Sequence, residues 1–364
     1  MDSGQWIVGR GWGIRDGRNM THERVTVDDS YQLCHAMARR AGSNFYPCFF
    51  VLPRSQRRAM EALYAFMRHT DDLGDRPASI AENQTVSPRD QLHAWRAALN
   101  RALGSEPGGM DGLPILAGLG LQVRTTANIA SSREHLAVST CQDLKSKDGL
   151  PILAGAERIL PAVADTVRRF DIPVEYLHAV IDGVEMDLTG RTYETFDELA
   201  GYCHRVASAV GLACVHIWGF RGDEPRELAR SCGLAFQLTN ILRDLGEDAR
   251  MDRVYLPRDD FAQCGYSVGA LRRGETGEAF ARLMELEIGR ARQFYCEGAD
   301  LFDRLEPAGR RIFGMMFEVY HRLLGRIERD PGAVFRRRVR LGRIEKMRVA
   351  ARWILLPPRR EALP

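Results

Sequence analysis

Apolar side chains recur at intervals of three and four residues along most of this chain, from about Ser30 onward. Such spacing gathers apolar residues on one face of a helix, and alternating valine-rich runs of the strand type are almost absent. The pattern therefore predicts an all-α protein. The helices are expected at residues 30–41, 53–74, 86–103, 156–170, 174–189, 195–219, 225–246, 267–272, 277–304, 306–328 and 337–355.

The domain organisation follows from the connecting segments. No linker rich in Pro, Gly or Ser divides the chain into halves, and 364 residues with 45% hydrophobic content can bury one large core. We expect a flexible N-terminal tail at 1–27, one domain at 28–335 and a basic amphipathic C-terminal segment at 336–364.

An internal repeat interrupts the predicted domain. The octapeptide DGLPILAG begins at Asp111 and again at Asp148, and chance does not account for two copies. Removing one copy with the intervening residues leaves both flanking helical patterns intact. We therefore expect an exposed insertion at about 105–148, because its middle is polar and weakly periodic. A functional lid is the alternative.

Two predicted helices are apolar around most of their circumference and polar along one narrow line, and we call these two lines the carboxylate stripes. The first stripe consists of Tyr64, Arg68, Asp71 and Asp75. The second stripe consists of Gln237, Asn240, Asp244 and Asp248. One acid pair would be weak evidence, because acids make up 48 of 364 residues. Two stripes in matching apolar surroundings favour buried sites over surface helices with salt bridges, which are the alternative.

Buried carboxylates indicate a bound cation. Each uncompensated carboxylate would cost several kcal/mol and would protonate instead, so a stripe of them in a core needs a positive partner. Oxygen ligands at helical spacing, without His or Cys, suit a hard ion. Magnesium fits best because it keeps part of its water and is held by one or two carboxylates together with substrate phosphates. Manganese is an alternative.

Composition excludes several other functions. The formal net charge of +3 gives no global field of the kind that attracts nucleic acid. The eight cysteines form no C-x-x-C pair and are expected to be reduced core thiols. Neither a signal peptide nor a membrane-spanning run is present, so we expect a cytoplasmic protein.

The segments around the carboxylate stripes resemble a known family, the squalene/phytoene synthases of the isoprenoid synthase superfamily. The resemblance runs from about Ser30 to Glu328, apart from the insertion. It rests on three motifs, GSNFYPCFFVLPRSQRRAMEALYAFMRHTDDLGD, VEMDLTGRTYETFDELAGYCHRVASAVG and QLTNILRDLGEDARMDRVYLP. Within the family the likeness is greatest to the bacterial hopanoid-pathway enzyme that makes presqualene diphosphate, and nearly as great to bacterial phytoene synthases.

The resemblance implies a bundle of antiparallel helices around a central cavity, with the two stripes facing each other across its mouth. It implies that two or three Mg²⁺ ions are bound by Asp71, Asp75, Asn240, Asp244 and Asp248. It implies that diphosphate or prenyl chain is contacted by Tyr64, Arg68, Gln237, Asn240, Tyr255, Phe45, Tyr46 and His204. Two positions depart from the family pattern. Gly is usual where Asp252 stands, and Tyr is frequent at or beside His204.

The implied reaction is a head-to-head (1'-1) condensation of two prenyl diphosphates, with farnesyl diphosphate giving presqualene diphosphate as the preferred assignment. Phytoene or dehydrosqualene synthesis is the alternative with the same fold. A non-catalytic assembly protein of this fold is the alternative from another class. No NADPH is expected, because no nucleotide fingerprint is present. The expected partners are prenyl diphosphates and downstream isoprenoid-pathway enzymes.

The C-terminal segment mixes basic and apolar residues. Eight basic residues lie between Arg336 and Arg352. The apolar residues among and after them are Val339, Leu341, Ile344, Met347, Trp353, Ile354 and Leu355. This composition suits a helix that lies on the anionic inner face of a membrane as a peripheral contact. A helix docked on the protein with a solvated basic face is the equal alternative.

Overall fold

The computed structural model describes residues 25–41, 46–74, 86–104 and 156–364. Within these ranges the chain is helical, and no strand forms apart from an isolated bridge between Phe220 and Leu305. The predicted all-α class is confirmed. The predicted insertion and nearly all of the predicted N-terminal tail lie outside the described residues, as do Phe45 and Asp75.

The helices agree with the predicted ranges in most places. The elements are α1 Val27–Arg40, η1 Tyr46–Val51, α2 Arg54–Gly74, α4 Pro88–Leu103, η3 Glu157–Ile159, α7 Leu160–Arg169, α8 Val174–Leu188, α9 Phe196–Cys203, η4 His204–Ser208, α10 Ala209–Trp218, α11 Arg226–Arg250, α12 Arg258–Cys264, α13 Val268–Arg273, α14 Glu278–Gly298, α15 Leu301–Arg304, α16 Pro307–Arg329, α17 Ala333–Arg336, α18 Arg343–Leu355 and η5 Arg360–Ala362.

Local sequence explains where several helices start. Thr26 caps α1 by accepting a hydrogen bond from the backbone of Asp29, whose carboxylate accepts from Thr26 in return. Ser87 and Thr195 cap α4 and α9 in the same way through their hydroxyl groups. Gly104 ends α4 in the left-handed conformation that glycine adopts without strain.

The structure differs from the predicted helices in four places. The helix α12 was not predicted, and the helix expected at 277–304 ends at Gly298 before the short α15. The helix expected at 195–219 contains a π-helical turn, η4, between α9 and α10. The helix expected at 337–355 begins only at Arg343.

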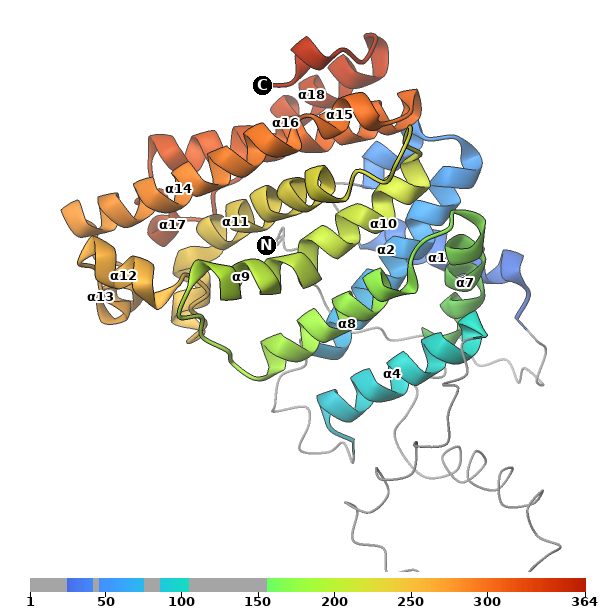
Figure 1. The fold of residues 1–364 in the computed structure, drawn as a ribbon, viewed down its shortest axis with the longest axis horizontal. Coiled ribbons are helices and arrows are strands. Elements are labelled where there is room, and N and C mark those ends of the chain that lie inside the picture. Colours follow the sequence, from blue (N-terminus) through green and yellow to red (C-terminus); the bar gives the residue numbers. More distant parts are fainter. Residues whose placement is uncertain (1–24, 42–45, 75–85, 105–155) are drawn as a thin grey trace, which may run out of the picture.

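Four helices surround the centre of the molecule. Figure 1 shows α8, α10 and α11 side by side, with α2 behind them, α4 beyond α8 and α14 with α16 beyond α11. Two glycines allow the central helices to approach closely. A Cβ on Gly183 of α8 would lie 2.5 Å from Cγ1 of Val206, and a Cβ on Gly233 of α11 would lie 2.5 Å from Cα of Ser208. Both partners belong to η4, so the π-helical turn packs directly against two neighbours.

The C-terminal helix α18 packs on α16. The Trp353 indole Nε1 donates to Glu318 at 2.7 Å, and the ring fills space that Gly314 leaves open. Val339, Leu341 and Trp353 are buried, so these three apolar residues face the protein. The segment is therefore docked on the protein through one face, while Ile344, Met347 and Leu355 on its other side are exposed, and membrane contact stays a prediction.

Candidate active site

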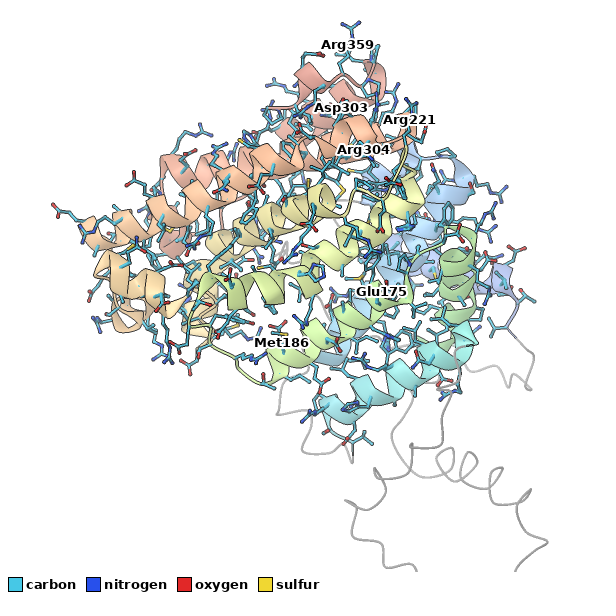
Figure 2. All side chains as sticks on the ribbon, viewed as in Figure 1. Glu175, Met186, Arg221, Asp303, Arg304 and Arg359 are labelled. Atoms are coloured by element: carbon cyan, nitrogen blue, oxygen red, sulfur yellow. The ribbon has the colours of Figure 1, made fainter. Side chains whose placement is uncertain are left out.

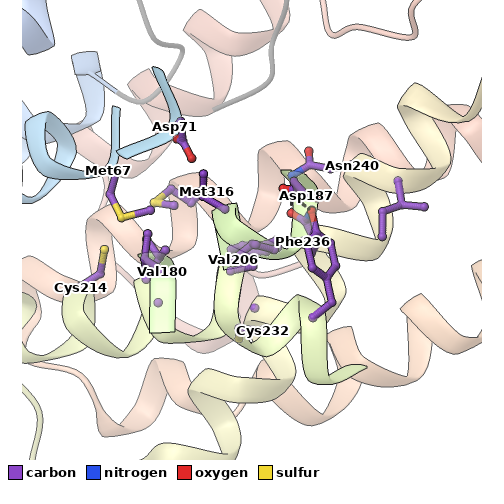
Figure 3. A pocket seen from close by; sticks show the side chains of 18 of the residues that line it. Met67, Asp71, Val180, Asp187, Val206, Cys214, Cys232, Phe236, Asn240 and Met316 are labelled. Atoms are coloured by element: carbon purple, nitrogen blue, oxygen red, sulfur yellow. Dashed lines mark hydrogen bonds between the residues drawn. The ribbon is translucent and has the colours of Figure 1, made fainter. Parts of the chain in front are cut away.

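One residue of the first carboxylate stripe and the whole second stripe line one pocket. Asp71 comes from α2, and Gln237, Asn240, Asp244 and Asp248 come from α11. The cavity has a volume of about 370 Å³, within the usual range for small-molecule sites. Figure 3 shows Asp71 on one side of this pocket and Asn240 with Asp187 on another.

The pocket is polar at one end and apolar over the rest of its length. The apolar lining comes from Met67, Val180, Val184, Val206, Val210, Cys214, Val215, Trp218, Phe236, Leu301, Phe313 and Met316. On α11 the lining runs from Ala229 to Asp248. At 1.5 Å per residue, Ala229 lies about 22 Å along the helix from Asp244. A long apolar ligand with an anionic head therefore suits the shape and polarity of this pocket.

Asp244 is held by two arginines. The Arg243 Nε donates to Asp244 at 2.9 Å, and Arg338 from the C-terminal segment forms an ion pair with the same carboxylate at 2.9 Å. Arg338 also reaches Glu247 at 3.4 Å. These guanidinium groups place positive charge beside the polar end of the pocket, where an anionic head would lie.

The ionised form of Asp248 is destabilised by its surroundings. Burial, followed by the nearby Asp244 charge, raises the pKa of Asp248 to about 7. A carboxyl group with such a pKa is about half protonated near pH 7, and a nearby cation would favour its ionised form. A divalent ion bound here would offset both the burial of the Asp248 charge and its repulsion by Asp244.

The donor set fits magnesium. The Asn240 Oδ1 is buried and has no hydrogen-bond partner among the described residues, while its Nδ2 donates to Gln237 at 3.3 Å. The available ligands are carboxylate and amide oxygens, which suit Mg²⁺. In the described part of the chain, no three Asp, Glu, His or Cys residues by themselves form a metal site. A metal here would therefore need oxygens from a substrate to complete its coordination, as Mg²⁺ commonly does with phosphates.

A second polar cluster completes the pocket, and sequence reasoning missed most of it. Asp187 of α8 accepts hydrogen bonds from Tyr202 at 3.1 Å and from Tyr255 at 3.3 Å, and the two tyrosine rings stack with centroids 5.4 Å apart. Burial and the Asp187 charge raise the pKa of both phenols, which therefore stay protonated. Arg253 also lines the pocket.

Comparisons with known proteins agree with this geometry. The family model described as squalene/phytoene synthase matches residues 38–345. The chain belongs to the squalene/phytoene synthase family. Members of this family condense prenyl diphosphates head to head, and they generally depend on Mg²⁺. The protein is therefore a prenyltransferase-type enzyme by family.

Several curated members of the squalene/phytoene synthase family are similar over nearly the whole chain. Phytoene synthase from Arthrospira platensis is 30% identical over 336 residues, covering 89% of this chain and 92% of that protein. Phytoene synthase from Mycobacterium tuberculosis is 29% identical, covering 89% of this chain and 90% of that protein. The 15-cis-phytoene synthase of Synechococcus elongatus is 27% identical, covering 86% and 89%.

Solved structures of the squalene/phytoene synthase family share the fold. A dehydrosqualene synthase in complex with a ligand matches with a TM-score of 0.67 at 21% identity, covering 90% of this chain and 96% of that one. The squalene synthase HpnC from Alicyclobacillus acidocaldarius matches with a TM-score of 0.63 at 23% identity, covering 84% and 95%. The predicted isoprenoid synthase bundle is thereby confirmed.

Four residues expected from the family resemblance do not line the pocket. Arg68 forms an ion pair with Asp72 at 2.8 Å, and Tyr64 lies against Phe49 edge to face. Tyr46 contacts His35 through a 3.4 Å hydrogen bond. These residues stay predictions as substrate contacts.

The fourth residue is His204, in the first position of η4. Burial, with the charges of Arg230 and Arg205, lowers the pKa of His204. Its side chain is therefore neutral near pH 7 and faces arginines outside the pocket, while Tyr202 two residues earlier lies in the pocket. Position 202, and not 204, supplies the phenol that the motif brings to this site.

The described helices are too short or too polar to span a membrane.

Proposed function

We propose that this enzyme catalyses the Mg²⁺-dependent head-to-head (1'-1) condensation of two prenyl diphosphates. One observation carries the proposal. Asp71 of the first stripe and all four residues of the second stripe, from helices far apart in the sequence, line a single pocket whose remaining lining is mainly apolar. This arrangement matches a substrate with an anionic head and a long hydrocarbon tail.

Magnesium would be held by Asp71, Asn240, Asp244 and Asp248, with Asp75 as a further ligand expected from the motif. When bound, the metal neutralises diphosphate and makes it a better leaving group. Arg243 and Arg253 line the pocket and Arg338 pairs with Asp244, so these three basic groups would bind the same diphosphate oxygens. Arg68 stays a further candidate for this role.

The apolar lining has a separate task. Loss of diphosphate leaves an allylic cation, which water would capture. Val180, Val206 and Phe236 exclude water from the length of the pocket, and aromatic faces stabilise nearby positive charge. The double bond of a second prenyl diphosphate can then attack the cation, and loss of a proton to the released diphosphate closes the ring of a cyclopropylcarbinyl diphosphate.

The Asp187 cluster would orient groups at the polar end. Asp187 accepts from both Tyr202 and Tyr255, so each phenol proton points at the carboxylate and each phenol oxygen is fixed in place. Tyr255 would lie over the diphosphate, as the family resemblance implies.

The preferred substrate assignment is farnesyl diphosphate, with presqualene diphosphate as the product. The likeness of the three motifs to the hopanoid-pathway enzyme supports this assignment. A specific observation favours a second candidate, 15-cis-phytoene synthesis from geranylgeranyl diphosphate. Three curated relatives with 27–30% identity are named phytoene synthases. We also propose peripheral membrane contact and transfer of the product to downstream isoprenoid-pathway enzymes, because such a product is apolar.

The deciding experiment incubates purified protein with Mg²⁺ and either farnesyl or geranylgeranyl diphosphate, with and without NADPH, and identifies the lipids formed. Presqualene diphosphate from farnesyl diphosphate, independent of NADPH, is expected for the preferred assignment. Phytoene from geranylgeranyl diphosphate would establish the second candidate instead. No coupled product from either substrate would refute the proposed function.

The same assay tests the metal ligands. Asp71→Ala and Asp244→Ala should each lower turnover at least 10³-fold, because the diphosphate then loses its metal-assisted departure. The far-ultraviolet circular dichroism should be unchanged. Turnover near the wild-type rate in either variant would show that the carboxylate does not hold the metal.

A further inference from the structure

The outward face of α18 concentrates exposed apolar side chains. Among the described residues, eight large apolar side chains are exposed, and five of them lie between residues 344 and 356. These five are Ile344 at 66%, Met347 at 66%, Ile354 at 48%, Leu355 at 77% and Leu356 at 56% exposure. Single exposed apolar residues are ordinary, whereas a contiguous group of this kind marks an interaction surface.

Helical spacing aligns these residues. Met347 follows Ile344 by three positions and Leu355 follows it by eleven, so the three lie along the outer face of one helix. Val349 and Trp353 occupy the opposite face and are buried against the protein. The helix is thus apolar on two faces, and among the described residues only its inner face packs against the rest of the protein.

The inner face holds α18 in place. Besides the Trp353 hydrogen bond to Glu318, the Glu345 carboxylate forms ion pairs with Arg326 at 2.5 Å and with Arg322 at 3.7 Å. Turning the outer residues inward would break these contacts. The outer face is therefore a fixed surface and not a tail that can fold back.

The carbonyl groups at the C-terminal end of α18 have hydrogen-bond donors within the protein, which suits apolar surroundings. A helix end normally leaves carbonyl groups that need water. Here the Arg311 Nη1 donates to the carbonyl oxygens of Trp353 at 2.8 Å, Ile354 at 2.9 Å and Leu356 at 3.0 Å. Three backbone carbonyls at this end of the helix are thus hydrogen-bonded from within the protein.

Arginines surround the apolar face. Arg343 and Arg348 are exposed on α18, Arg337 and Arg340 precede it, and Arg359 follows it. None of these five makes an ion pair within the described part of the chain, whereas Glu345 on the same helix is already paired. Figure 1 shows α18 at the edge of the molecule next to α16, and Figure 2 shows Arg359 at the same edge.

We propose that the outer face of α18 docks on an anionic lipid bilayer, with the helix axis in the membrane plane. Aliphatic side chains at the centre would enter the acyl boundary, and the surrounding arginines would contact lipid phosphates. A second copy of this chain fits the surface poorly, because it would bring one ring of arginines against another. The inference extends the proposed function to a defined surface and does not depend on the length of the prenyl substrate.

The test is co-sedimentation of the full chain with vesicles made of phosphatidylcholine alone or of equal parts phosphatidylcholine and phosphatidylglycerol. Wild-type protein should bind the mixed vesicles at least ten-fold more strongly, and added salt should weaken that binding. The double variant Ile344→Ser, Leu355→Ser should lose at least ten-fold. Arg343→Glu should lose roughly five-fold or more, since each basic residue contributes about that factor at an anionic surface.

Val27→Ser is the matched control, because Val27 is also an exposed apolar residue but lies at the start of α1. This variant should bind vesicles like the wild type, and thermal unfolding should be similar in all variants. The proposal is overturned if wild-type protein does not bind anionic vesicles, or if the double variant binds these vesicles as strongly as Val27→Ser does. Dimer formation that the double variant abolishes, measured by sedimentation velocity without vesicle binding, would assign the surface to a second copy instead.

Discussion

At the scale of single residues, the charge of Asp248 is the most informative. The folded state raises its pKa from the ordinary 3.8 to about 7, so between these values the folded protein binds more protons than the unfolded chain. Stability then falls as pH rises from about 4 to about 7, and stays lower above that range. About three pKa units correspond to at most roughly 4 kcal/mol.

We predict that Asp248→Asn removes this pH dependence in metal-free protein. The variant keeps the shape of the side chain without the buried charge, so its melting temperature at pH 8 should exceed that of the wild type by several degrees. At pH 4 the two should melt together. Thermal scans across this pH range in a chelating buffer measure the effect, and parallel curves for the two proteins would contradict it.

Trp218 is the residue that we expect to limit substrate length. It lines the pocket at the end of α10 that meets the start of α11, which is the end opposite the carboxylate stripes. The side chain is 3% exposed, and its indole nitrogen has no hydrogen-bond partner in the described part of the chain. Its backbone carbonyl accepts from Gln56 at 3.3 Å, which fixes the position.

We predict that Trp218→Leu shifts the ratio of kcat/KM for geranylgeranyl over farnesyl diphosphate upward by about ten-fold or more. One further isoprene unit in the pocket would bury several carbon groups, and each would contribute about 1 kcal/mol to the binding free energy of the longer substrate. Trp95→Phe is the control, because Trp95 is equally buried but does not line the pocket. An unchanged ratio in the Trp218 variant would show that another residue sets the length.

At the scale of elements, the contact between α11 and η4 requires a glycine. A Cβ at Gly233 would lie 2.5 Å from Cα and 2.7 Å from the backbone nitrogen of Ser208, and backbone atoms cannot move aside cheaply. The helices would have to separate, and the pocket residues that they carry would separate with them.

We predict that Gly233→Ala lowers the free energy of unfolding by about 1 to 3 kcal/mol. Gly289→Ala is the matched control, because Gly289 lies in α14 with nothing within 4 Å of an added Cβ. That variant should gain up to about 1 kcal/mol from better helix propensity. Chemical denaturation measures both, and equal stability of the two variants would disprove the close contact.

Sequence patterns predicted the long helices well and the short features poorly. The α2 and α11 helices were predictable because a polar line among apolar residues repeats over several turns. By contrast, α12 spans only seven residues after Pro257, too few for a period to show. The π-helical turn adds one residue to a helix without any change of composition, so spacing could not reveal it.

The same reasoning explains the outcome at the site. Asp71, Asn240, Asp244 and Asp248 were found because they form spaced series, and the structure brings all four to one pocket. Asp187 was missed because no second acid stands three or four residues away from it on α8. Its partners Tyr202 and Tyr255 come from other elements, so only tertiary structure assembles the cluster.

At the scale of the whole molecule, the repeated octapeptide offers a test of domain organisation. The insertion interpretation predicts that residues 111–147 can be deleted, which leaves one DGLPILAG copy. The deletion should leave the melting temperature unchanged and the coupling rate within about two-fold of the wild type. Loss of coupling with an unchanged melting temperature would favour the lid alternative. A large drop in melting temperature would show that the segment belongs to the core.

Two thiols in the pocket bear on the durability of the enzyme. Burial raises the pKa of Cys214 to about 12 and raises that of Cys232 as well, and the Cys232 thiol donates to the Gly298 carbonyl at 3.0 Å. Sulfur attacks electrophiles as the thiolate, which neither residue forms near neutral pH. A carbocation generated beside these side chains would therefore meet neutral thiols and not thiolates, which lowers the rate at which the proposed intermediate would alkylate the enzyme at these two positions.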